Sequence, residues 1–527
     1  MKRVLVSDSL SPRGIEILRA APELQVDVQT GLKPDELKAV IGNYDALVVR
    51  SATKVTEEIL EAAGNLKVVG RAGIGVDNVD VPAATKRGVV VMNTPGGNTV
   101  TTAEHALALM MSLVRYIPQA SISMKAGVWE KKKFEGHELC GKTLGVVGLG
   151  NIGSIVADRA LGLKMKVLAY DPFISQDRAA ELGVELTDLD GLFRRADIVT
   201  VHVPLLEETR NLIAAEAFEK MKDGVYLVCA ARGGIVDEAA LLAALESGKV
   251  AGAALDVFQK EPPGLTSLVA HERVICTPHL GASTVEAQEA VSLQVADQIV
   301  DYLVTGTIRN AINVPSVPSE MLEQMRPYLE MARNLGRLQA QLGAAALRSV
   351  ELEYSGKTAE GRTGLYTAAA LEGLLAASLG GRVNLVNAPV VARERGIRVV
   401  ETLARAGEDY SALIRLGVET DSGTSILAGA IFGKREPRVV EIDGIGIEAI
   451  PQGHLLVFWN YDRPGLVGSI GTTLGKHAIN IGQLAFGRET VGGRAVTVVN
   501  IDSPAEEAVL QELRGLPNVI SVTQAFL

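Results

Sequence analysis

The sequence predicts an α/β protein in which a larger doubly wound domain is inserted into a smaller one, with two further modules behind them. Three observations predict this fold class. Short apolar strands alternate with helical patterns up to about residue 315, and a glycine-rich turn near residue 150 joins a strand to a helix. Residues 453–527 follow the order strand, helix, strand, strand, helix, strand. A chain of 527 residues is long enough for three or four such domains.

The first segment, residues 1–96, has the pattern of a small doubly wound domain. Loops at the carboxyl ends of such strands line a cleft, so Arg50, Ser51, Arg71 and Gly73 are candidate ligand-facing residues. The expected strands are Arg3–Val6, Ala46–Val49, Lys67–Gly70 and Val89–Met92, and the expected helices are Pro12–Ala20, Pro34–Ile41, Glu57–Ala63 and Val81–Arg87.

A long apolar helical pattern follows and runs to Ile117. Thr101 and Glu104 have the spacing of a capping box, which predicts a helix start at this point. We expect this helix to connect the first domain to the second. His105 lies within it and is interpreted as a packed helix residue rather than a catalyst.

The segment 142–171 has the sequence of one βαβ unit with G-x-G-x-x-G at its first turn. Gly148 makes the tight turn, Gly150 lets the backbone approach a pyrophosphate, and Gly153 lets helix and strand pack closely. Asp171 lies where a carboxylate accepts hydrogen bonds from ribose hydroxyls, which favours NAD over NADP. The expected strands are Leu144–Val147 and Lys166–Tyr170, with a helix from Ser154 to about Leu163.

Four further strands continue this domain, and each ends in a polar or charged group. In an open α/β sheet that edge is where ligands bind. The expected strands are Ile198–Val203, Tyr226–Ala230, Ala251–Asp256 and Val274–Thr277, and a helix from about Thr284 to Thr305 returns the chain to the first domain.

The two segments after residue 315 differ from the α/β pattern of the preceding chain. Residues 316–450 are rich in Ala, Gly and Leu, with a long helix at Glu320–Gln341 and no catalytic constellation. Residues 453–527 have the βαββαβ order of a ferredoxin-like module. Its expected strands are Leu455–Asn460, Ile479–Phe486, Ala495–Ile501 and Val519–Gln524, and its expected helices are Leu466–Lys476 and Ala505–Arg514.

Composition excludes several classes of function. The net charge of −10 argues against a general nucleic-acid footprint. No apolar run approaches the length of a membrane span, and the N-terminal strand is too short for a signal peptide, so a cytoplasmic enzyme is expected. The cysteines Cys140, Cys229 and Cys276 are scattered and odd in number, which predicts free thiols and neither a disulfide framework nor a metal site.

Arg232, Glu261 and His279 form a candidate hydride-transfer constellation beside the nucleotide motif. Arg232 can bind the carboxylate of a 2-hydroxy acid in a bidentate fork. His279 can accept the hydroxyl proton as hydride leaves, and can return it during reduction. Glu261 can hold the imidazole and stabilise its charged form.

The motifs at 148–153, 231–237, 261–262 and 277–281 resemble those of the D-isomer-specific 2-hydroxyacid dehydrogenases, over residues 1–315. The loops at 49–53 and 70–80, with 462–465, resemble the long-type D-3-phosphoglycerate dehydrogenases. This resemblance implies a substrate-binding domain (1–97 and 283–315), a Rossmann-type NAD-binding domain (98–282), an α+β intervening regulatory domain (316–450) and an ACT domain (451–527). It also implies oxidation of 3-phosphoglycerate to 3-phosphohydroxypyruvate, the first step of L-serine synthesis, in a homotetramer.

The resemblance further implies roles for individual residues. Arg232, Glu261 and His279 are the implied catalytic residues, and Asp256 would contact the nicotinamide carboxamide. Arg50, Ser51, Arg71, Gly73 and Asn98 would line the substrate side, and Asn460, Asp462 and Asn480 would bind an effector, L-serine. The implied NAD contacts are Gly148, Gly150, Asn151, Ile152, Gly153, Asp171, His202, Pro204, Ala230, Ala231, Arg232, Asp256, His279 and Gly281.

Two alternatives stay open at this stage. One is a related dehydrogenase acting on glyoxylate, hydroxypyruvate or a lactate-like acid, which would not need phosphate-facing arginines. The other is a catalytically idle amino-acid sensor built on the same folds. The complete Arg232–Glu261–His279 set argues against the second alternative.

Overall fold

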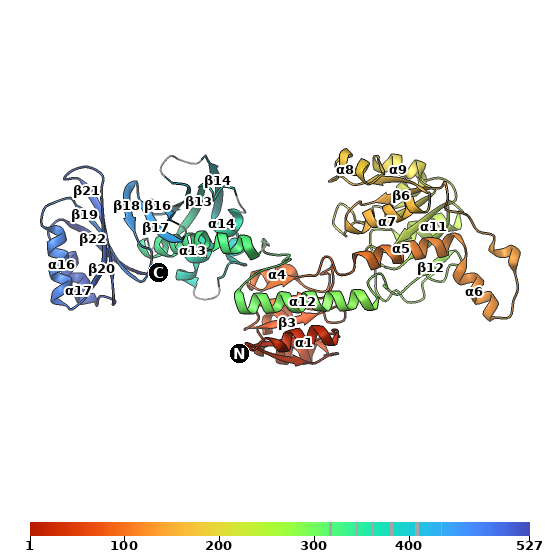
Figure 1. The fold of residues 1–527 in the computed structure, drawn as a ribbon, viewed down its shortest axis with the longest axis horizontal. Coiled ribbons are helices and arrows are strands. Elements are labelled where there is room, and N and C mark those ends of the chain that lie inside the picture. The colour runs from red at the N-terminus through yellow and green to blue at the C-terminus, as the bar shows by residue number, and fades with distance from the viewer. Residues whose placement is uncertain (316–318, 344–345, 361–362, 380–382, 406–409, 434) are drawn as a thin grey trace. The chain divides into compact units, whose positions relative to one another are not determined.

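A computed structural model describes residues 1–315, 319–343, 346–360, 363–379, 383–405, 410–433 and 435–527 (Figure 1). Contacts divide the chain into two compact units. The first contains Met1–Ser9, Ile15–Asn93 and Val295–Leu527, and the second contains Leu10–Gly14 and Thr94–Gln294. The expected boundary at residue 316 lies outside the described residues. Among the described helices, none combines the length and the apolar character needed to cross a membrane.

The first sheet belongs to the first unit and is entirely parallel, in the order β2-β1-β3-β4-β5. This is a doubly wound strand order, as the sequence predicted. The strands are β1 (Lys2–Val6), β2 (Leu24–Val28), β3 (Ala46–Val49), β4 (Val68–Arg71) and β5 (Val90–Met92). Strand β2 was not predicted from the sequence, because its Leu-Gln-Val-Asp-Val run alternates apolar with polar residues at the edge of the sheet.

Helices cover this sheet and fix its loops. Leu37, Ile59 and Leu60 pack against one face of it. At Gly70 a side chain would meet Val295 Cγ2 at 2.8 Å, so glycine lets helix α12 lie directly against β4. The helices are α1 (Pro12–Ala20), α2 (Pro34–Val40), η1 (Ile41–Asn43), α3 (Glu57–Ala62), α4 (Val81–Lys86) and α12 (Val285–Thr305).

The second sheet has seven parallel strands in the order β12-β11-β10-β9-β6-β7-β8. Counted from β6, this is the order 3-2-1-4-5-6 of a dinucleotide-binding fold with one added strand. The strands are β6 (Thr143–Val147), β7 (Lys166–Tyr170), β8 (Glu185–Leu186), β9 (Ile198–Val201), β10 (Val225–Cys229), β11 (Val250–Leu255) and β12 (Val274–Cys276).

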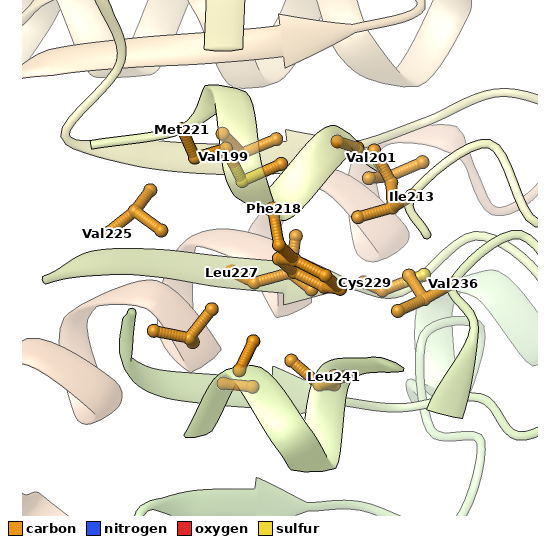
Figure 2. Packing of buried hydrophobic residues seen from close by; sticks show 14 of the residues in the cluster. Val199, Val201, Ile213, Phe218, Met221, Val225, Leu227, Cys229, Val236 and Leu241 are labelled. Atoms are coloured by element: carbon orange, nitrogen blue, oxygen red, sulfur yellow. The ribbon is translucent and has the colours of Figure 1, made fainter. Parts of the chain in front are cut away.

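Both faces of this sheet are buried, which explains why its strands are almost continuously apolar. On one face, Leu227 and Cys229 of β10 pack with Phe218 and Leu241 (Figure 2). On the other face, a second cluster includes Val228 of the same strand. The helices are α5 (Thr99–Val114), α6 (Ile117–Lys125), η2 (Lys131–Phe134), α7 (Asn151–Gly162), α8 (Gln176–Glu181), α9 (Leu189–Arg195), α10 (Ala215–Lys220) and α11 (Glu238–Glu246).

Two predicted helix starts were wrong. Helix α5 begins at Thr99, so Thr101 lies inside it and forms no cap; its hydroxyl lies 3.2 Å from that of Thr284. The Glu104 carboxylate instead pairs with Arg159 at 2.8 Å. Helix α7 begins at Asn151 rather than Ser154, because the glycine turn passes directly into the helix.

The segment after α12 forms a mixed sheet in the order β14-β13-β15-β16-β17-β18. Its helices α13 (Ser319–Leu342) and α14 (Thr363–Leu379) cross closely, since a Cβ at Gly336 would meet Ala370 O at 2.1 Å and one at Gly373 would meet Arg333 O at 2.1 Å. Helix α15 spans Ala388–Glu394. The strands are β13 (Leu347–Gly356), β14 (Arg398–Ala404), β15 (Ala412–Thr420), β16 (Gly423–Phe432), β17 (Glu436–Ile442) and β18 (Ile445–Ala449).

The C-terminal module has the βαββαβ order that the sequence predicted. Its antiparallel sheet, β20-β21-β19-β22, packs residues such as Phe458 against Ile470 and Leu513 of its helices. The elements are β19 (His454–Tyr461), α16 (Leu466–Lys476), β20 (Ile481–Arg488), β21 (Arg494–Ile501), α17 (Glu507–Arg514) and β22 (Val519–Phe526).

Candidate active site

The glycine turn after β6 has the geometry of a pyrophosphate cradle. Gly148 has φ +92°, a conformation that L side chains rarely adopt. A Cβ at Gly153 would meet Gly148 O at 1.9 Å, so glycine is required for α7 to close on the turn. Gly150 has no atom within 4 Å of its Cβ position. Asn151 and Ile152 open helix α7, whose first N–H groups are available to an anion.

Asp171 follows β7, and its carboxylate accepts hydrogen bonds from backbone N–H groups on both sides of it, one of them in the glycine turn after β6. Its Oδ2 accepts from Leu149 N at 2.8 Å, and its Oδ1 accepts from Phe173 N at 2.9 Å. An ionised carboxylate has about four acceptor positions, so each oxygen keeps capacity for a ribose hydroxyl. The turn, the helix start and this carboxylate therefore fit NAD.

His202 lies beside the same turn, after β9. A Cβ at Gly148 would meet its carbonyl oxygen at 3.0 Å, so the His202 backbone forms one wall of the turn. Its Nε2 lies 2.9 Å from the Thr200 hydroxyl. Burial lowers the pKa of His202 to about 4, so the ring is neutral at physiological pH and offers no positive charge to a phosphate.

The loops after β10 and β11 are in direct contact. A Cβ at Gly233 would meet Phe258 O at 1.8 Å, so only glycine allows this approach. Arg232 precedes Gly233 and is half-buried, with Nη1 donating to Ala231 O at 2.7 Å. Phe258 N in turn donates to Glu261 Oε1 at 3.0 Å.

Glu261 and His279, which the sequence predicted to act together as an acid–base pair, are in direct contact. Glu261 Oε2 lies 2.7 Å from His279 Nδ1. Because an ionised carboxylate only accepts, Nδ1 carries the hydrogen and Nε2 is left to accept a proton. The His279 side chain is 47% exposed, so a substrate can reach it. Its backbone, at φ +55°, is held by its own N–H donating to Asp256 O at 2.9 Å.

Asp256 is fully buried and is the most densely hydrogen-bonded carboxylate of this loop cluster. It accepts from the Thr277 hydroxyl at 2.6 Å, Leu280 N at 2.7 Å and Gly281 N at 2.8 Å. Burial raises the pKa of Asp256, but hydrogen bonds from His105, Thr277 and the two backbone amides outweigh burial and bring the pKa below its ordinary value. The group is therefore an anionic acceptor at neutral pH.

His105 was interpreted from the sequence as a packed helix residue, and that interpretation was incomplete. Its Nε2 lies 3.1 Å from Asp256 Oδ1 and 3.2 Å from the Thr277 hydroxyl. No local sequence signal could have found this contact, since His105 and Asp256 are 151 positions apart and lie on different elements.

Asp8 holds the loop after β3 in the first unit, which carries the predicted site residues Arg50 and Ser51. This buried carboxylate accepts from Arg50 N at 2.6 Å and from the Thr53 hydroxyl at 2.7 Å. Asn78, in the loop after β4, donates to Arg50 O at 2.8 Å and to Thr53 O at 2.7 Å. Burial lowers the pKa of the Arg50 guanidinium, which still stays charged because arginine titrates far above neutral pH.

Arg71 is the last residue of β4, and its side chain lies over Gly73. A Cβ at Gly73 would fall 1.5 Å from Arg71 Nη1, and Gly73 has φ +146°. Ser51 is exposed in the loop after β3. Asn98 belongs to the second unit, where its buried Oδ1 accepts no hydrogen bond from any described residue.

The predicted effector residues do not come together within one copy of the C-terminal module. Asp462 follows β19, beside Tyr461, which pairs with Arg494 at the start of β21. Asn480 lies at the other end of β21, where its Nδ2 donates to Asp502 at 2.8 Å. Seven residue steps along β21 correspond to about 23 Å. A ligand of the size of serine cannot reach both side chains within one copy of the module.

Asp462 and Asn460 both have hydrogen-bond partners within the C-terminal module. Asp462 Oδ2 accepts from Arg488 at 2.9 Å and from Gly492 N at 3.1 Å. The Gly492 amide, and then Arg488, lower the pKa of Asp462. Asn460 is fully buried, and its Oδ1 accepts from the Thr497 hydroxyl at 2.9 Å.

Comparison with known proteins assigns the domains and the family. Residues 107–281 match the NAD-binding domain of the D-isomer-specific 2-hydroxyacid dehydrogenases, 324–443 the D-3-phosphoglycerate dehydrogenase intervening domain, and 454–518 the ACT domain. A D-3-phosphoglycerate dehydrogenase of Archaeoglobus fulgidus is 46% identical over 99% of both chains. This chain belongs to the D-3-phosphoglycerate dehydrogenase family. The Bacillus subtilis relative of the same name is 42% identical, again over 99% of both chains.

Solved structures of dehydrogenases resemble a large part of this D-3-phosphoglycerate dehydrogenase family member. The D-lactate dehydrogenase of Aquifex aeolicus, complexed with NAD and lactic acid, is 28% identical, with a TM-score of 0.52, and covers 60% of this chain and 100% of its own. The apo D-lactate dehydrogenase of Escherichia coli is also 28% identical, with a TM-score of 0.53 over 59% and 100%. The fold, the family and the NAD cofactor expected from the sequence are confirmed.

Proposed function

We propose that this chain oxidises 3-phospho-D-glycerate to 3-phosphohydroxypyruvate with NAD, the first step of L-serine biosynthesis, in the cytoplasm. The observation that supports this most directly is the 2.7 Å contact between His279 Nδ1 and Glu261 Oε2 at the carboxyl edge of the nucleotide-binding sheet. That pair supplies an acid–base group on a fold whose cofactor is NAD. The relatives that match the whole chain bear the name of this activity.

Arg232 binds the carboxylate of the 2-hydroxy acid, because a guanidinium matches the planar geometry of a carboxylate. In the same position it polarises the adjoining carbonyl during reduction. His279 Nε2 takes the proton from the C2 hydroxyl as hydride leaves C2, and Glu261 stabilises the imidazolium that forms. The bound cofactor supplies the hydride acceptor.

The phosphate group of the substrate is assigned to Arg50 and Arg71. Arg50 follows β3 and Arg71 ends β4, both at the carboxyl edge of their parallel sheet, and Asp8 and Asn78 fix the Arg50 loop. A phosphate offers oxygens that arginine binds in a fork, so these side chains select a phosphorylated acid. Glyoxylate, hydroxypyruvate and lactate lack the group that Arg50 and Arg71 bind.

A comparison of kcat/KM values tests the proposal. With NADH as reductant, we expect 3-phosphohydroxypyruvate to be preferred over hydroxypyruvate, glyoxylate and pyruvate by at least about tenfold, the scale of one charge-assisted hydrogen bond. A preference for an unphosphorylated acid would assign the chain to another activity of the wider family. Absence of turnover with all four acids would favour an idle sensor.

The C-terminal module supports a role in feedback control, and we assign L-serine as its effector. Asp462 presents a carboxylate for an ammonium group, and Gly465, at φ +93°, leads into the N-terminus of α16, where N–H groups can bind a carboxylate. Because Asp462 and Asn480 are about 23 Å apart in one module, a site that uses both needs two copies of the chain.

Self-association has independent support in the second unit. Its segment from α6 onward exposes Ile117, Ile122, Met124 and Trp129, whose side chains are 53–78% accessible. A run of large apolar side chains on a surface is typical of a protein–protein interface. We assign a homotetramer, in which this segment and the C-terminal module provide separate contacts between copies.

A further inference from the structure

We propose that Glu238 is a positioning residue for the acid–base pair: its carboxylate holds the loop after β11 in the shape that brings Glu261 to His279. Glu238 Oε1 accepts a hydrogen bond from Gln259 N at 2.6 Å. In this role Glu238 meets no reacting atom and transfers no proton. The inference rests on the proposed function in taking Glu261 and His279 as the acid–base pair.

The loop from Phe258 to Glu261 has few anchors. The Phe258 side chain is buried in the core, and Phe258 N donates to Glu261 Oε1 at 3.0 Å. Gln259, Lys260 and Glu261 are exposed. In the part of the chain that the structure describes, no hydrogen bond between backbone groups involves Lys260 or Glu261. The Gln259 amide is therefore the last backbone group held before the loop reaches Glu261.

The Gln259 amide lies against the loop that follows Arg232. A Cβ at Gly233 would lie 2.7 Å from Gln259 N and 1.8 Å from Phe258 O. Glu238 is half-buried, and its hydrogen bond to this amide is assisted by charge. Such bonds are about twice as strong as those between neutral groups. Glu238 thus fixes the amide at a point where the two loops already touch.

Glu238 is the first residue of helix α11, and that helix start is rigid. Asp237 caps it through Oδ1, which accepts from Ala240 N at 2.9 Å. Asp237 N also donates to Ile213 O at 2.9 Å, and α11 buries Leu241 in the core. A carboxylate on such a base keeps its position when the neighbouring loop moves.

One carboxylate thereby sets the distance between two parts of the candidate site. Arg232, which is assigned to the substrate carboxylate, lies on the loop that leads to Glu238. Glu261 follows the amide that Glu238 holds, and its Oε2 lies 2.7 Å from His279 Nδ1. Without Glu238, the Glu261 carboxylate should sample other positions. His279 should then lose the acceptor that keeps the hydrogen on Nδ1.

A simpler explanation of Glu238 is that it only stabilises the helix start. Acidic side chains in the first turn interact favourably with the helix dipole, which requires charge but no contact with another loop. Glu216, in the first turn of α10, is exposed and provides the comparison. Two substitutions separate charge from reach. Glu238→Gln keeps the length of the side chain and loses the charge, whereas Glu238→Asp keeps the charge and is one methylene shorter.

Single turnovers of the full chain with 3-phosphohydroxypyruvate and NADH measure the effect on hydride transfer. We expect Glu238→Ala and Glu238→Asp to lower the rate about tenfold, the scale of a hydrogen bond to a charged group, and Glu238→Gln to stay within about threefold of the native chain. The Kd for NADH should not change, because the glycine turn and Asp171 are untouched. Glu216→Ala is the matched control and should change neither value. Glu238→Asp also serves if Glu238→Ala does not fold.

A double-mutant cycle shows whether Glu238 acts through Glu261. If it does, Glu238→Ala should cost nothing further in a chain that already carries Glu261→Ala, because the carboxylate that it positions is gone. A residue that supports the fold or the substrate independently would add its full loss in that background.

The tautomer of His279 gives a readout that needs no turnover. In histidine-labelled full-length chain, nitrogen chemical shifts report which ring nitrogen carries the hydrogen, and His279→Ala identifies the resonances. We expect the hydrogen on Nδ1 in the native chain, and a shift toward the Nε2 form in Glu238→Ala and in Glu261→Ala. Glu238→Gln should keep the native tautomer.

Three results would overturn the proposal: independent losses in the cycle, a native rate in Glu238→Asp, or a native His279 tautomer in Glu238→Ala. A loss in Glu216→Ala equal to that in Glu238→Ala would likewise reduce Glu238 to an acid that stabilises a helix start. Failure of the proposed function is distinguishable. The native chain would then not reduce 3-phosphohydroxypyruvate, while the His279 tautomer would still respond to Glu238→Ala.

Discussion

The hydrogen bond between His279 Nδ1 and Glu261 Oε2 decides which nitrogen of the imidazole is available for chemistry. Glu261 is itself held by Phe258 N, so the pair has a fixed orientation. A lone histidine on a loop would sample both tautomers and many rotamers. In the proposed mechanism, these contacts hold His279 in the orientation that a general base needs.

Replacing His279 by Ala should therefore remove the base and little else. We expect kcat to fall by about 10²–10⁴-fold, the usual contribution of general acid–base catalysis. The Kd for NADH should stay within about twofold, since the glycine turn and Asp171 are untouched. Steady-state kinetics with parallel calorimetry measure both. A loss of kcat below about fivefold would assign the proton transfer to another group.

We expect Arg50 and Arg71 to bind the phosphate group of the substrate. Replacing either by Ala should raise the KM for 3-phosphohydroxypyruvate at least about tenfold, the scale of one hydrogen bond to a charged group. The KM for hydroxypyruvate, which lacks the phosphate, should change little. Equal losses on both substrates would mean that the arginines bind the shared carboxylate or only support the fold.

We expect Asp171 to set the choice between NAD and NADP. Its carboxylate repels a 2′-phosphate and accepts from ribose hydroxyls, so Asp171→Ala should narrow the preference for NAD mainly by weakening NAD. The ratio of kcat/KM for the two cofactors measures this. Equal use of both cofactors by the native chain would contradict the role of Asp171.

At the scale of elements, the join between β6 and α7 depends on glycine at two positions for different reasons. At Gly153 a Cβ would collide with Gly148 O at 1.9 Å, whereas the Cβ position of Gly150 is free of atoms within 4 Å. Gly153 is thus needed for the packing of the folded chain. Gly150 is needed only if a ligand approaches it.

Alanine at each position separates these two roles. We expect Gly153→Ala to lower Tm by several degrees and to abolish NADH binding, since overpacking costs about 1–3 kcal/mol. Gly150→Ala is the matched variant, and it should leave Tm unchanged while weakening NADH. Thermal unfolding and calorimetry give both readouts. Normal NADH affinity in Gly150→Ala would place the pyrophosphate elsewhere.

The elements could be predicted from the sequence wherever burial imposes a pattern. Strand β7 is apolar because it is buried on both faces of a parallel sheet, and its predicted bounds agree with the structure. Strand β2 was missed because edge exposure admits polar residues. The start of α5 was misplaced because Thr101 and Glu104 have capping spacing yet make tertiary contacts.

The site could be predicted only in part, because its contacts depend on how loops and elements pack in three dimensions. Arg232, Glu261 and His279 were identifiable as chemical types at strand ends, although the contact between Glu261 and His279 depends on how the loops fold. The contact of His105 with Asp256 depends on the packing of α5 against the sheet. The separation of Asp462 from Asn480 follows from strand direction, which spacing along the chain does not reveal.

At the scale of the whole molecule, control of the reaction by serine would require coupling between distinct sites. Such couplings are typically about 1–3 kcal/mol, or about 5–150-fold in affinity. The C-terminal module has its own hydrophobic core, so it can bind a ligand without sharing the catalytic residues. Two copies are needed to bring an Asp462 and an Asn480 to one ligand.

L-Serine should therefore inhibit the native oligomer, and Asp462→Ala should abolish the inhibition while leaving uninhibited kcat nearly unchanged. Initial rates across serine concentrations, with the oligomeric state measured alongside, provide the test. Millimolar serine that neither binds by calorimetry nor changes the rate would refute the control. Serine binding that Asp462→Ala abolishes, without any response of the rate, would reduce the module to a binding site.

The most direct test of the central claim follows the hydride itself. The chain is incubated with 3-phosphohydroxypyruvate and NADH that carries deuterium at the transferable position of the nicotinamide. We expect one deuterium at C2 of 3-phospho-D-glycerate for each cofactor oxidised, seen by mass spectrometry and NMR, and far less labelled product in the same time with His279→Ala. Unlabelled product, the L isomer, or labelling only with unphosphorylated acids would contradict the account.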